Sequence, residues 1–150
     1  MDPSTPQFAD ERRRAGTYGY WPKAVPQTEK ELAEAGFYYL GIILATFCET
    51  TDVLWYYMNL GVYMSVSGVG DHVQCFHCNG GLINWEREDV PWAEHARYFG
   101  ECPFLLEKMG SDFVTWVKGR KDLRRNEILK KISEIQRKRY GYYIKRIFSS

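Results

Sequence analysis

Residues 75–102 read CFHCNGGLINWEREDVPWAEHARYFGEC. Cys75 and Cys78 form a C-x2-C turn, His95 follows after a gap of sixteen residues, and Cys102 follows after six more. A turn of this kind places two thiolates around one cation, and a histidine with a further cysteine completes a tetrahedral zinc site. The spacing therefore predicts one structural zinc ion held by Cys75, Cys78, His95 and Cys102.

Two other interpretations of these cysteines stay open at this stage. They are a redox-active Cys-x-x-Cys pair and unliganded cysteines in a hydrophobic core. Zinc is favoured because all four residues are typical ligands at a typical spacing, and three sulfurs with one nitrogen leave no open position for catalysis. We expect the remaining candidates, His72, His77 and Cys48, to be surface or core residues rather than ligands.

Length and composition are those of a small globular protein. The chain has 150 residues, of which 45% are hydrophobic, 16% aromatic and 26% charged, and this length predicts one domain. The N-terminus lacks the apolar stretch of a secretory signal, so we expect an intracellular protein without a disulfide framework. The expected location is the cytoplasm, with the nucleus as a second compartment.

Charge is divided unevenly along the chain. Residues 118–150 hold 12 Lys/Arg and 3 Asp/Glu (+9), whereas residues 1–117 hold 8 and 16 (−8). For the basic tail we favour a solvated helix to about residue 140, followed by disorder, over a nucleic-acid-binding role. Its stripe of Ile128, Ile132 and Ile135 could pack on a partner helix or remain uncovered.

The order of helix and strand signals predicts an α+β fold. We expect a disordered leader over 1–11, a folded zinc domain over 12–117 and a basic helical tail over 118–150. Within the domain, β-prone runs alternate with helix starts and turn residues. The expected strands cover 37–40, 72–75 and 82–85, and the expected helices cover 28–35, 91–99, 103–109 and 111–117.

Several helix ends carry local signals. Thr28 and Glu31 have the spacing of a capping box, and Gly36 can end that helix in a left-handed conformation. Asp89 and Ser111 are predicted to be N-caps of the helices that follow them.

Residues 41–67 interrupt this pattern with a largely apolar run whose only charges are Glu49 and Asp52. A membrane helix needs about 20 apolar residues, and the two acids argue against a span. Joining Leu40 directly to Gly68 gives a continuous hairpin sequence. We therefore expect an insertion at a hairpin tip, with the flanking strands still paired. A loop that binds a partner or touches a membrane is the alternative.

Several motifs around the predicted zinc ligands occur together in one known family. Over about residues 12–117, except 41–67, the chain resembles the baculoviral inhibitor-of-apoptosis repeat, the BIR domain of inhibitor of apoptosis proteins. The motifs that carry this resemblance are Arg14-x-x-Thr17-Tyr18-x-x-Trp21-Pro22, Leu32-Ala33-Glu34-Ala35-Gly36-Phe37, Gly70-Asp71-His72-Val73-Gln74-Cys75-Phe76-His77-Cys78, Gly80-Gly81-Leu82, Trp85, Asp89, Pro91-Trp92-Ala93-Glu94-His95 and Cys102.

The resemblance implies a small α+β zinc domain with a three-stranded antiparallel sheet, and a protein-binding function. Groove-bearing members of the family bind a free N-terminal tetrapeptide that begins with Ala, displayed by processed caspases and by their antagonists, and so restrain apoptosis. The peptide adds as a strand beside the third strand of the sheet. Larger members carry a RING ubiquitin-ligase domain, which the one remaining cysteine could not build. We therefore expect no enzyme activity.

Seven residues occupy the positions of the family's groove. Asp89 and Glu94 would bind the terminal ammonium group, and Leu82, Trp85 and Tyr98 would surround the alanine methyl. The full set expected to bind peptide is Gly81, Leu82, Ile83, Trp85, Asp89, Glu94 and Tyr98. Without the resemblance, Asp89 would be only a helix cap and Glu94 only a solvated acid.

Three groove positions depart from the family pattern. Tyr98 replaces a usual Trp, Glu94 replaces a common Gln, and Ile83 replaces a commonly polar residue. These departures concern affinity and peptide preference rather than the existence of the groove.

Two functions follow from these features. The groove residues favour binding of caspases or their antagonists. The combination of one repeat with a helical tail instead favours a mitotic or chromatin adaptor that reads the N-terminal Ala of a histone tail. Peptides that begin Ala-Val-Pro and Ala-Arg would separate the two.

Overall fold

The structure is a computed structural model that describes residues 2–22, 24–40 and 70–148. The chain divides into two compact units, Met1–Arg87 and Glu88–Ser150. The first unit contains η1 (Pro6–Phe8), α1 (Glu11–Ala15), η2 (Gly16–Tyr20), α2 (Glu29–Glu34), β1 (Phe37–Tyr39), β2 (Val73–Cys75) and β3 (Gly81–Leu82). The second contains α5 (Pro91–Phe99), α6 (Pro103–Met109), α7 (Ser111–Lys118) and α8 (Arg125–Phe148).

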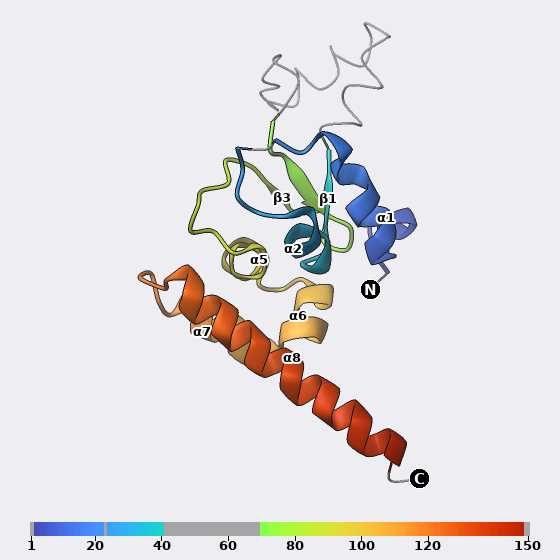
Figure 1. The fold of residues 1–150 in the computed structure, drawn as a ribbon, viewed down its shortest axis with the longest axis vertical. Coiled ribbons are helices and arrows are strands. Elements are labelled where there is room, and N and C mark those ends of the chain that lie inside the picture. The colour runs from blue at the N-terminus through green and yellow to red at the C-terminus, as the bar shows by residue number, and fades with distance from the viewer. Residues whose placement is uncertain (1, 23, 41–69, 149–150) are drawn as a thin grey trace, which may run out of the picture. The chain divides into compact units, whose positions relative to one another are not determined.

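A three-stranded antiparallel sheet lies at the centre of the first unit, as predicted. The strand order is β1-β2-β3, with Phe37 opposite Cys75, and α1 and α2 lie beside the strands (Figure 1). Strand β1 is buried along its whole length, and the ring of Tyr39 stacks on Tyr18 with centroids 5.8 Å apart. This aromatic core holds β2, and with it the first predicted zinc ligand, in a fixed place.

The third strand is shorter than the sequence predicts. A strand was expected over 82–85, but β3 covers only Gly81–Leu82. Asn84 adopts a φ of 61°, which an extended strand does not allow. The main-chain N–H groups of Asn84 and Trp85 donate to the carboxylate of Asp71 at 2.9 and 2.6 Å. These two bonds replace sheet pairing and turn the chain away from β2.

Helix α2 forms as its capping signals predict. The hydroxyl of Thr28 accepts from the N–H of Glu31 at 3.2 Å, and the Glu31 carboxylate accepts from the N–H of Thr28 at 2.9 Å. Gly36 follows the helix with a φ of 91°, a left-handed conformation that glycine adopts at little cost. Leu32 and Ala33 are buried, so the capped helix presents its apolar face to the core.

The leader is ordered, so the expectation of disorder over 1–11 is wrong for most of that segment. The N–H and the hydroxyl of Thr5 both donate to the carbonyl of Phe76, at 2.9 and 3.0 Å. Phe8 stacks on Tyr38 with ring centroids 4.2 Å apart. Partners far along the chain therefore order a segment whose own composition gives no sign of structure.

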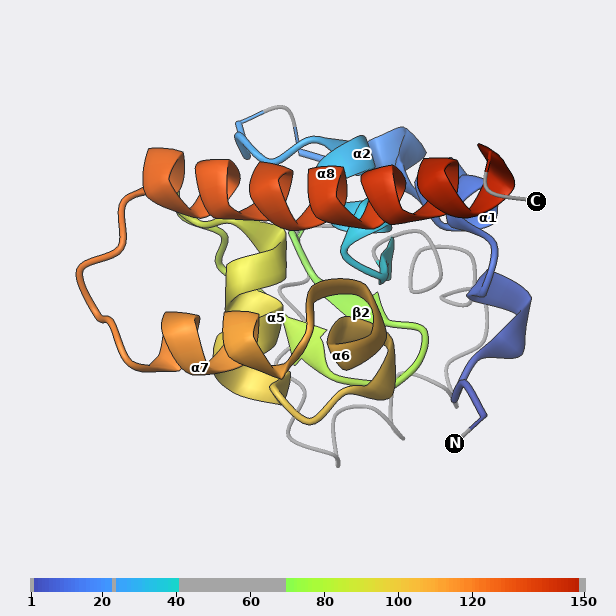
Figure 2. The ribbon, with the colours of Figure 1, turned by 90° about the horizontal axis from the view of Figure 1, so that it is seen from below.

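The second unit is built from helices in its described part (Figure 2). The N-cap of α5 is Val90 and that of α7 is Gly110, and neither end has a side-chain cap. The predicted caps at Asp89 and Ser111 are therefore wrong. Asp89 lies one residue too early, and Ser111 already belongs to the helix. Pro91 begins α5 instead, because its fixed φ suits the first helical position.

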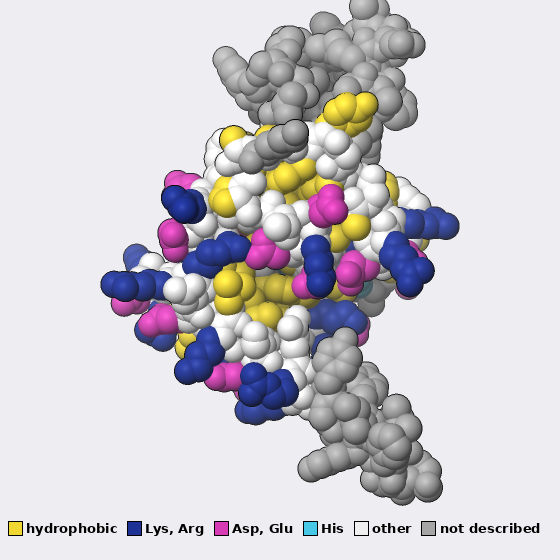
Figure 3. Space-filling model, in the orientation of Figure 1, with side chains coloured by type: hydrophobic (Ala, Val, Ile, Leu, Met, Phe, Trp, Pro, Cys, Tyr) yellow, Lys and Arg dark blue, Asp and Glu magenta, His cyan; other side chains and the backbone are white. Residues whose placement is uncertain are grey.

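The basic tail forms one long helix that packs within the second unit. Helix α8 continues to Phe148, beyond the expected end near residue 140. Ile128 and Ile132 are only 2% and 6% exposed, and α8 contacts α6. The chain therefore covers two residues of its own isoleucine stripe without a partner helix, whereas the third, Ile135, is half-buried. Cationic and acidic side chains are interspersed on the molecular face shown in Figure 3.

The insertion lies outside the described residues, as does Cys48, but the strands on either side of it are paired. The N–H of Leu40 donates to the carbonyl of His72 at 3.0 Å, and the hydroxyl of Tyr39 donates to the carbonyl of Gly70 at 2.8 Å. The prediction that the strands pair across this segment is confirmed. Within the described ranges, no helix is both long and apolar enough to span a membrane.

Deleting residues 41–67 is expected to leave the zinc domain folded. Shortening the connection from about 31 to about 4 residues should stabilise the fold by roughly 2 kcal/mol, because less entropy is lost on closing the loop. The zinc-to-protein ratio, the thermal midpoint and the soluble yield of the deletion variant would test this. A variant without bound zinc would instead place the segment in the core.

Candidate metal centre and peptide-binding residues

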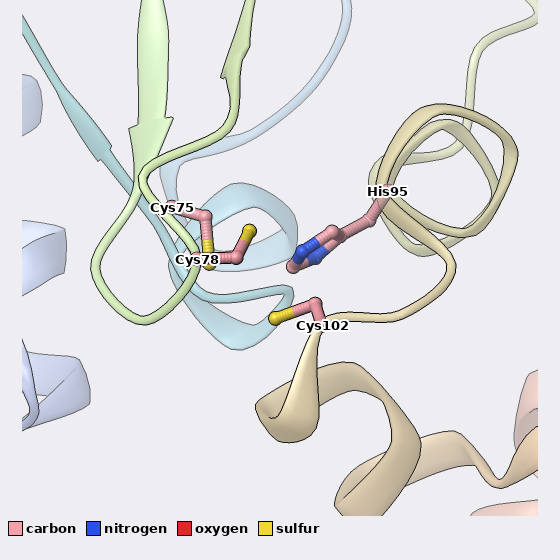
Figure 4. A group of neighbouring side chains, drawn as sticks. All are labelled: Cys75, Cys78, His95 and Cys102. Atoms are coloured by element: carbon pink, nitrogen blue, oxygen red, sulfur yellow. The ribbon is translucent and has the colours of Figure 1, made fainter. Parts of the chain in front are cut away.

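Four metal-binding side chains meet in the structure. The potential ligand atoms of Cys75, Cys78, His95 and Cys102 all lie within 4.8 Å of one another, and the side chains point toward a common centre (Figure 4). His95 and Cys75 are fully buried, Cys102 is 2% exposed and Cys78 is half-buried. The four residues predicted from spacing are therefore brought together.

The first two ligands lie on a tight turn at the end of β2. The N–H of Cys75 donates to the carbonyl of Gly80 at 2.9 Å, and the N–H of Asn79 donates back to the carbonyl of Cys75 at 3.1 Å. Asn79 has a φ of 63°, which asparagine tolerates better than most residues. The N–H of His77 donates to Cys75 Sγ at 3.4 Å. Such a donor stabilises a thiolate, the form of cysteine that binds metal.

The other two ligands are joined by a short connection. His95 lies on α5, and Cys102 is the N-cap residue of α6, with its N–H donating to the carbonyl of Phe99 at 2.9 Å. A Cβ atom at Gly100 would come within 2.7 Å of Val114 Cγ1. Glycine at this position therefore allows the chain between the two ligands to lie close against α7.

The donor set fits one structural zinc ion. Tetrahedral zinc with Zn–S distances of about 2.3 Å implies sulfur–sulfur separations of about 3.8 Å. In the structure no two of the four ligand atoms are more than 4.8 Å apart. Three thiolates with one imidazole suit zinc better than the hard cations that prefer oxygen. A bound zinc would cross-link the turn after β2 to α5 and α6 and would have no vacant position for substrate.

Three of the predicted groove residues, Gly81, Leu82 and Ile83, lie on or beside β3. Gly81 and Leu82 form the strand, and Ile83 is 58% exposed. Trp85 is only 8% exposed, and its ring lies edge-on to Phe37 with centroids 6.2 Å apart. Ile83 therefore offers apolar surface to a ligand, whereas most of the Trp85 side chain belongs to the core.

Two residues before β2 shape the same segment, and sequence reasoning missed their roles. Asp71 accepts the N–H groups of Asn84 and Trp85 described above. A Cβ atom at Gly81 would lie 3.0 Å from His72 Nε2, so the imidazole occupies the space beside the glycine. Burial lowers the pKa of His72 below its usual value, and the charge of Asp71 partly opposes this shift.

The three groove residues of the second unit, Asp89, Glu94 and Tyr98, lie on α5 or immediately before it. Glu94 is 9% exposed and pairs with Arg97, with Oε1 and Nη1 3.1 Å apart, so its interpretation as a solvated acid is wrong. Asp89 is half-buried and does not cap α5. Tyr98 is 67% exposed. Asp89 is therefore not a helix cap, and Glu94 is not a solvated acid. The exposed ring of Tyr98 lies one helical turn beyond Glu94.

The family model and the similar proteins that match this chain all belong to one family. Residues 14–106 match the family model described as "BIR: Inhibitor of Apoptosis domain". The chain is 37% identical over 113 residues to Baculoviral IAP repeat-containing protein 7-B of Xenopus laevis, covering 75% of this chain and 25% of that protein. It is 37% identical over 109 residues to E3 ubiquitin-protein ligase IAP-3 of Orgyia pseudotsugata multicapsid polyhedrosis virus, covering 73% and 31%. A mouse relative, Baculoviral IAP repeat-containing protein 7, is 34% identical over 113 residues, covering 75% and 30%.

These relatives are longer proteins, and this chain spans about a quarter to a third of their length. The family model covers well over half of the 150 residues and includes all four clustered ligands. The chain therefore belongs to the inhibitor of apoptosis family and carries its zinc-binding BIR domain.

Proposed function

We propose that this chain restrains apoptosis by binding the free N-terminal tetrapeptides of caspases or their antagonists, those that begin with alanine. The observation that carries the proposal is the pair of acids at the start of α5, neither of which serves as the helix cap. Asp89 and Glu94 would hold the terminal ammonium group by charge-assisted hydrogen bonds. Exposed Tyr98 would cover the alanine methyl.

The edge of the sheet supports the peptide's mode of binding. Strand β3 is the last in the order β1-β2-β3, and within the described residues it pairs only with β2. Its other edge can accept the main chain of an extended peptide over Gly81–Leu82, continuing along Ile83. In this arrangement main-chain bonds would supply affinity, and contacts with Ile83 and Tyr98 would select among side chains.

Binding should depend on the free amine of the peptide. Each charge-assisted hydrogen bond contributes roughly 1.5–3 kcal/mol, so an acetylated Ala-Val-Pro peptide should bind about 10- to 100-fold more weakly than the free form. The double variant Asp89→Ala/Glu94→Ala should bind both peptides weakly and remove most of this preference. Isothermal titration or fluorescence polarisation with the two peptides would measure it.

Glu88→Ala is the matched control, because Glu88 is exposed and adjacent in sequence to Asp89. This variant should keep the preference for the free amine. Zinc content and cooperative unfolding should be retained in every variant, which separates lost binding from lost folding. Equal affinity of the unmodified chain for free and acetylated peptides would refute the mechanism.

A second function is favoured by the 24-residue helix α8 that follows the BIR domain. An adaptor of chromatin or of the mitotic machinery would use the same acids to read a histone N-terminus that begins Ala-Arg. Tighter binding of Ala-Arg than of Ala-Val-Pro peptides would select this function, and with it a nuclear location. Tighter binding of Ala-Val-Pro than of Ala-Arg peptides would favour caspases or their antagonists as partners, and with them a cytoplasmic location.

A further inference from the structure

The tail helix makes a specific contact with the segment that carries Asp89. Arg125, the first residue of α8, donates a hydrogen bond from its guanidinium group to the main-chain carbonyl of Asp89. The two residues are 36 apart in sequence, and the bond is partly buried. Figure 2 shows α8 and α5, the helix that follows Asp89 in the chain.

Helix α8 is anchored firmly enough to hold the guanidinium group in place. Ile128 and Ile132 lie on its buried face, and the helix contacts α6. Further along, Arg139 Nη1 donates to the carbonyl of Lys108 at 2.8 Å. Arg139 also lies 3.9 Å from the carboxylate of Glu107. Arg125 is therefore fixed by a helix that apolar and polar contacts tie to the rest of the second unit.

The segment before Asp89 lies at the surface, where the carbonyl of Glu86 accepts a hydrogen bond from Gln27 Nε2 at 2.6 Å. The three residues before Asp89, Glu86, Arg87 and Glu88, are all exposed. On the other side, α5 begins at Pro91, and its N-cap residue Val90 provides no side-chain cap. A hydrogen bond from a packed helix restricts the main chain at Asp89, and restricting a binding residue before the ligand arrives lowers the entropy lost on binding.

We propose that Arg125 is a positioning residue for the peptide amine, so that the tail helix takes part in the binding site. This inference rests on the function proposed above. Arg125 acts through the Asp89 carbonyl and does not touch the peptide. It orients the Asp89 carboxylate toward the ammonium group, and the contribution is specific to ligands that have a free amine.

Removing the guanidinium group has two effects that oppose each other. The restraint on Asp89 is lost, which weakens binding, and a positive charge near a cationic ligand is also lost, which strengthens it. Arg125→Met removes both the hydrogen bond and the charge while keeping an apolar stem. Arg125→Gln removes the charge but keeps an amide N–H that can donate to a carbonyl. The pair of variants therefore separates the bond from the charge.

The test compares the affinities of free and acetylated Ala-Val-Pro peptides for the full chain and its variants. Arg125→Met should weaken binding of the free peptide by about fivefold to tenfold, the usual effect of one hydrogen bond, and should leave the acetylated peptide nearly unaffected. Arg125→Gln should bind more tightly than Arg125→Met. Arg124→Met is the matched control, because Arg124 is its exposed neighbour, and it should bind like the unmodified chain.

The possible outcomes separate this inference from the function on which it rests. If the unmodified chain does not prefer the free amine, the proposed function itself fails. If it does, and Arg125→Met keeps the preference, Arg125 does not position Asp89. An equal loss for both peptides would also overturn the inference, because it would indicate general loosening of the domain. If Arg125→Met does not fold, Arg125→Ala compared with Arg124→Ala gives the same decision, because alanine also removes both the hydrogen bond and the charge.

Discussion

Cys78→Ser and His95→Ala are each expected to abolish zinc binding and cooperative unfolding. Structural zinc contributes roughly 10–16 kcal/mol of apparent folding free energy in small domains, whereas a typical domain has a net stability of about 5–15 kcal/mol. The ligands here come from the turn after β2 and from α5 and α6, so losing one of them removes the cross-link between distant parts of the chain. The measurements are zinc content by mass spectrometry, near-UV circular dichroism and thermal unfolding.

His77→Ala provides the control for both variants. His77 lies between the two cysteines of the turn, but it is not a member of the ligand cluster, and its bond to Cys75 Sγ comes from the main chain. This variant should bind one zinc ion and unfold cooperatively. Removing zinc from the unmodified chain with a chelator should reproduce the effect of the ligand variants. A metal-free protein that kept its near-UV spectrum and its melting transition would contradict the zinc requirement.

Arg14→Met is expected to destabilise the zinc-loaded protein by at least about 3 kcal/mol, because three main-chain carbonyls lose their donor and each such loss costs about 1–3 kcal/mol. Arg14 is 2% exposed. Its Nε donates to the carbonyl of Ala33 at 2.9 Å, and its Nη1 donates to those of Phe8 and Ala9, both at 2.8 Å. The guanidinium carbon lies 4.6 Å from the ring centre of Phe76. One side chain thus connects the leader, α2 and the turn that carries two zinc ligands.

Burial lowers the pKa of Arg14 from its usual value, with nearby negative groups opposing the shift, and its carbonyl partners are those a charged guanidinium binds. Denaturant unfolding at constant free zinc would measure the effect of Arg14→Met. Arg13→Met, which changes an exposed neighbour, should shift the stability by less than about 0.5 kcal/mol. The free energy of unfolding of Arg14→Lys should lie between those of Arg14→Met and Arg13→Met, because lysine keeps the charge but lacks the planar set of donors. Stability of Arg14→Met equal to that of Arg13→Met would show that these contacts contribute nothing.

The features that were predicted correctly depend on residues close together in the chain or on unusual chemistry. The capping box of Thr28 and Glu31 needs only four consecutive residues, and its hydrogen bonds form in any helix that begins there. The zinc ligands are further apart, but few combinations of cysteine and histidine can hold a metal at this spacing. The motifs around these ligands also identified the family resemblance, and that resemblance predicted the three-stranded sheet.

The features that were missed depend on partners that no local pattern specifies. Thr5 is ordered by a carbonyl 71 residues away, and β3 ends early because Asp71 binds main-chain groups 13 and 14 residues further on. The peptide groove remains a prediction of the family resemblance, and the two acids at α5 support it without testing it.

The tail helix shows both what the sequence can predict and what only the folded structure reveals. Periodicity alone identified the stripe of Ile128 and Ile132, since residues at helical spacing must share a face. Only the folded chain decides that α8 packs against α6 and brings Arg125 to the carbonyl of Asp89. Side-chain periodicity is a property of the local backbone, whereas the surface that covers a stripe depends on which distant elements the whole fold places beside it.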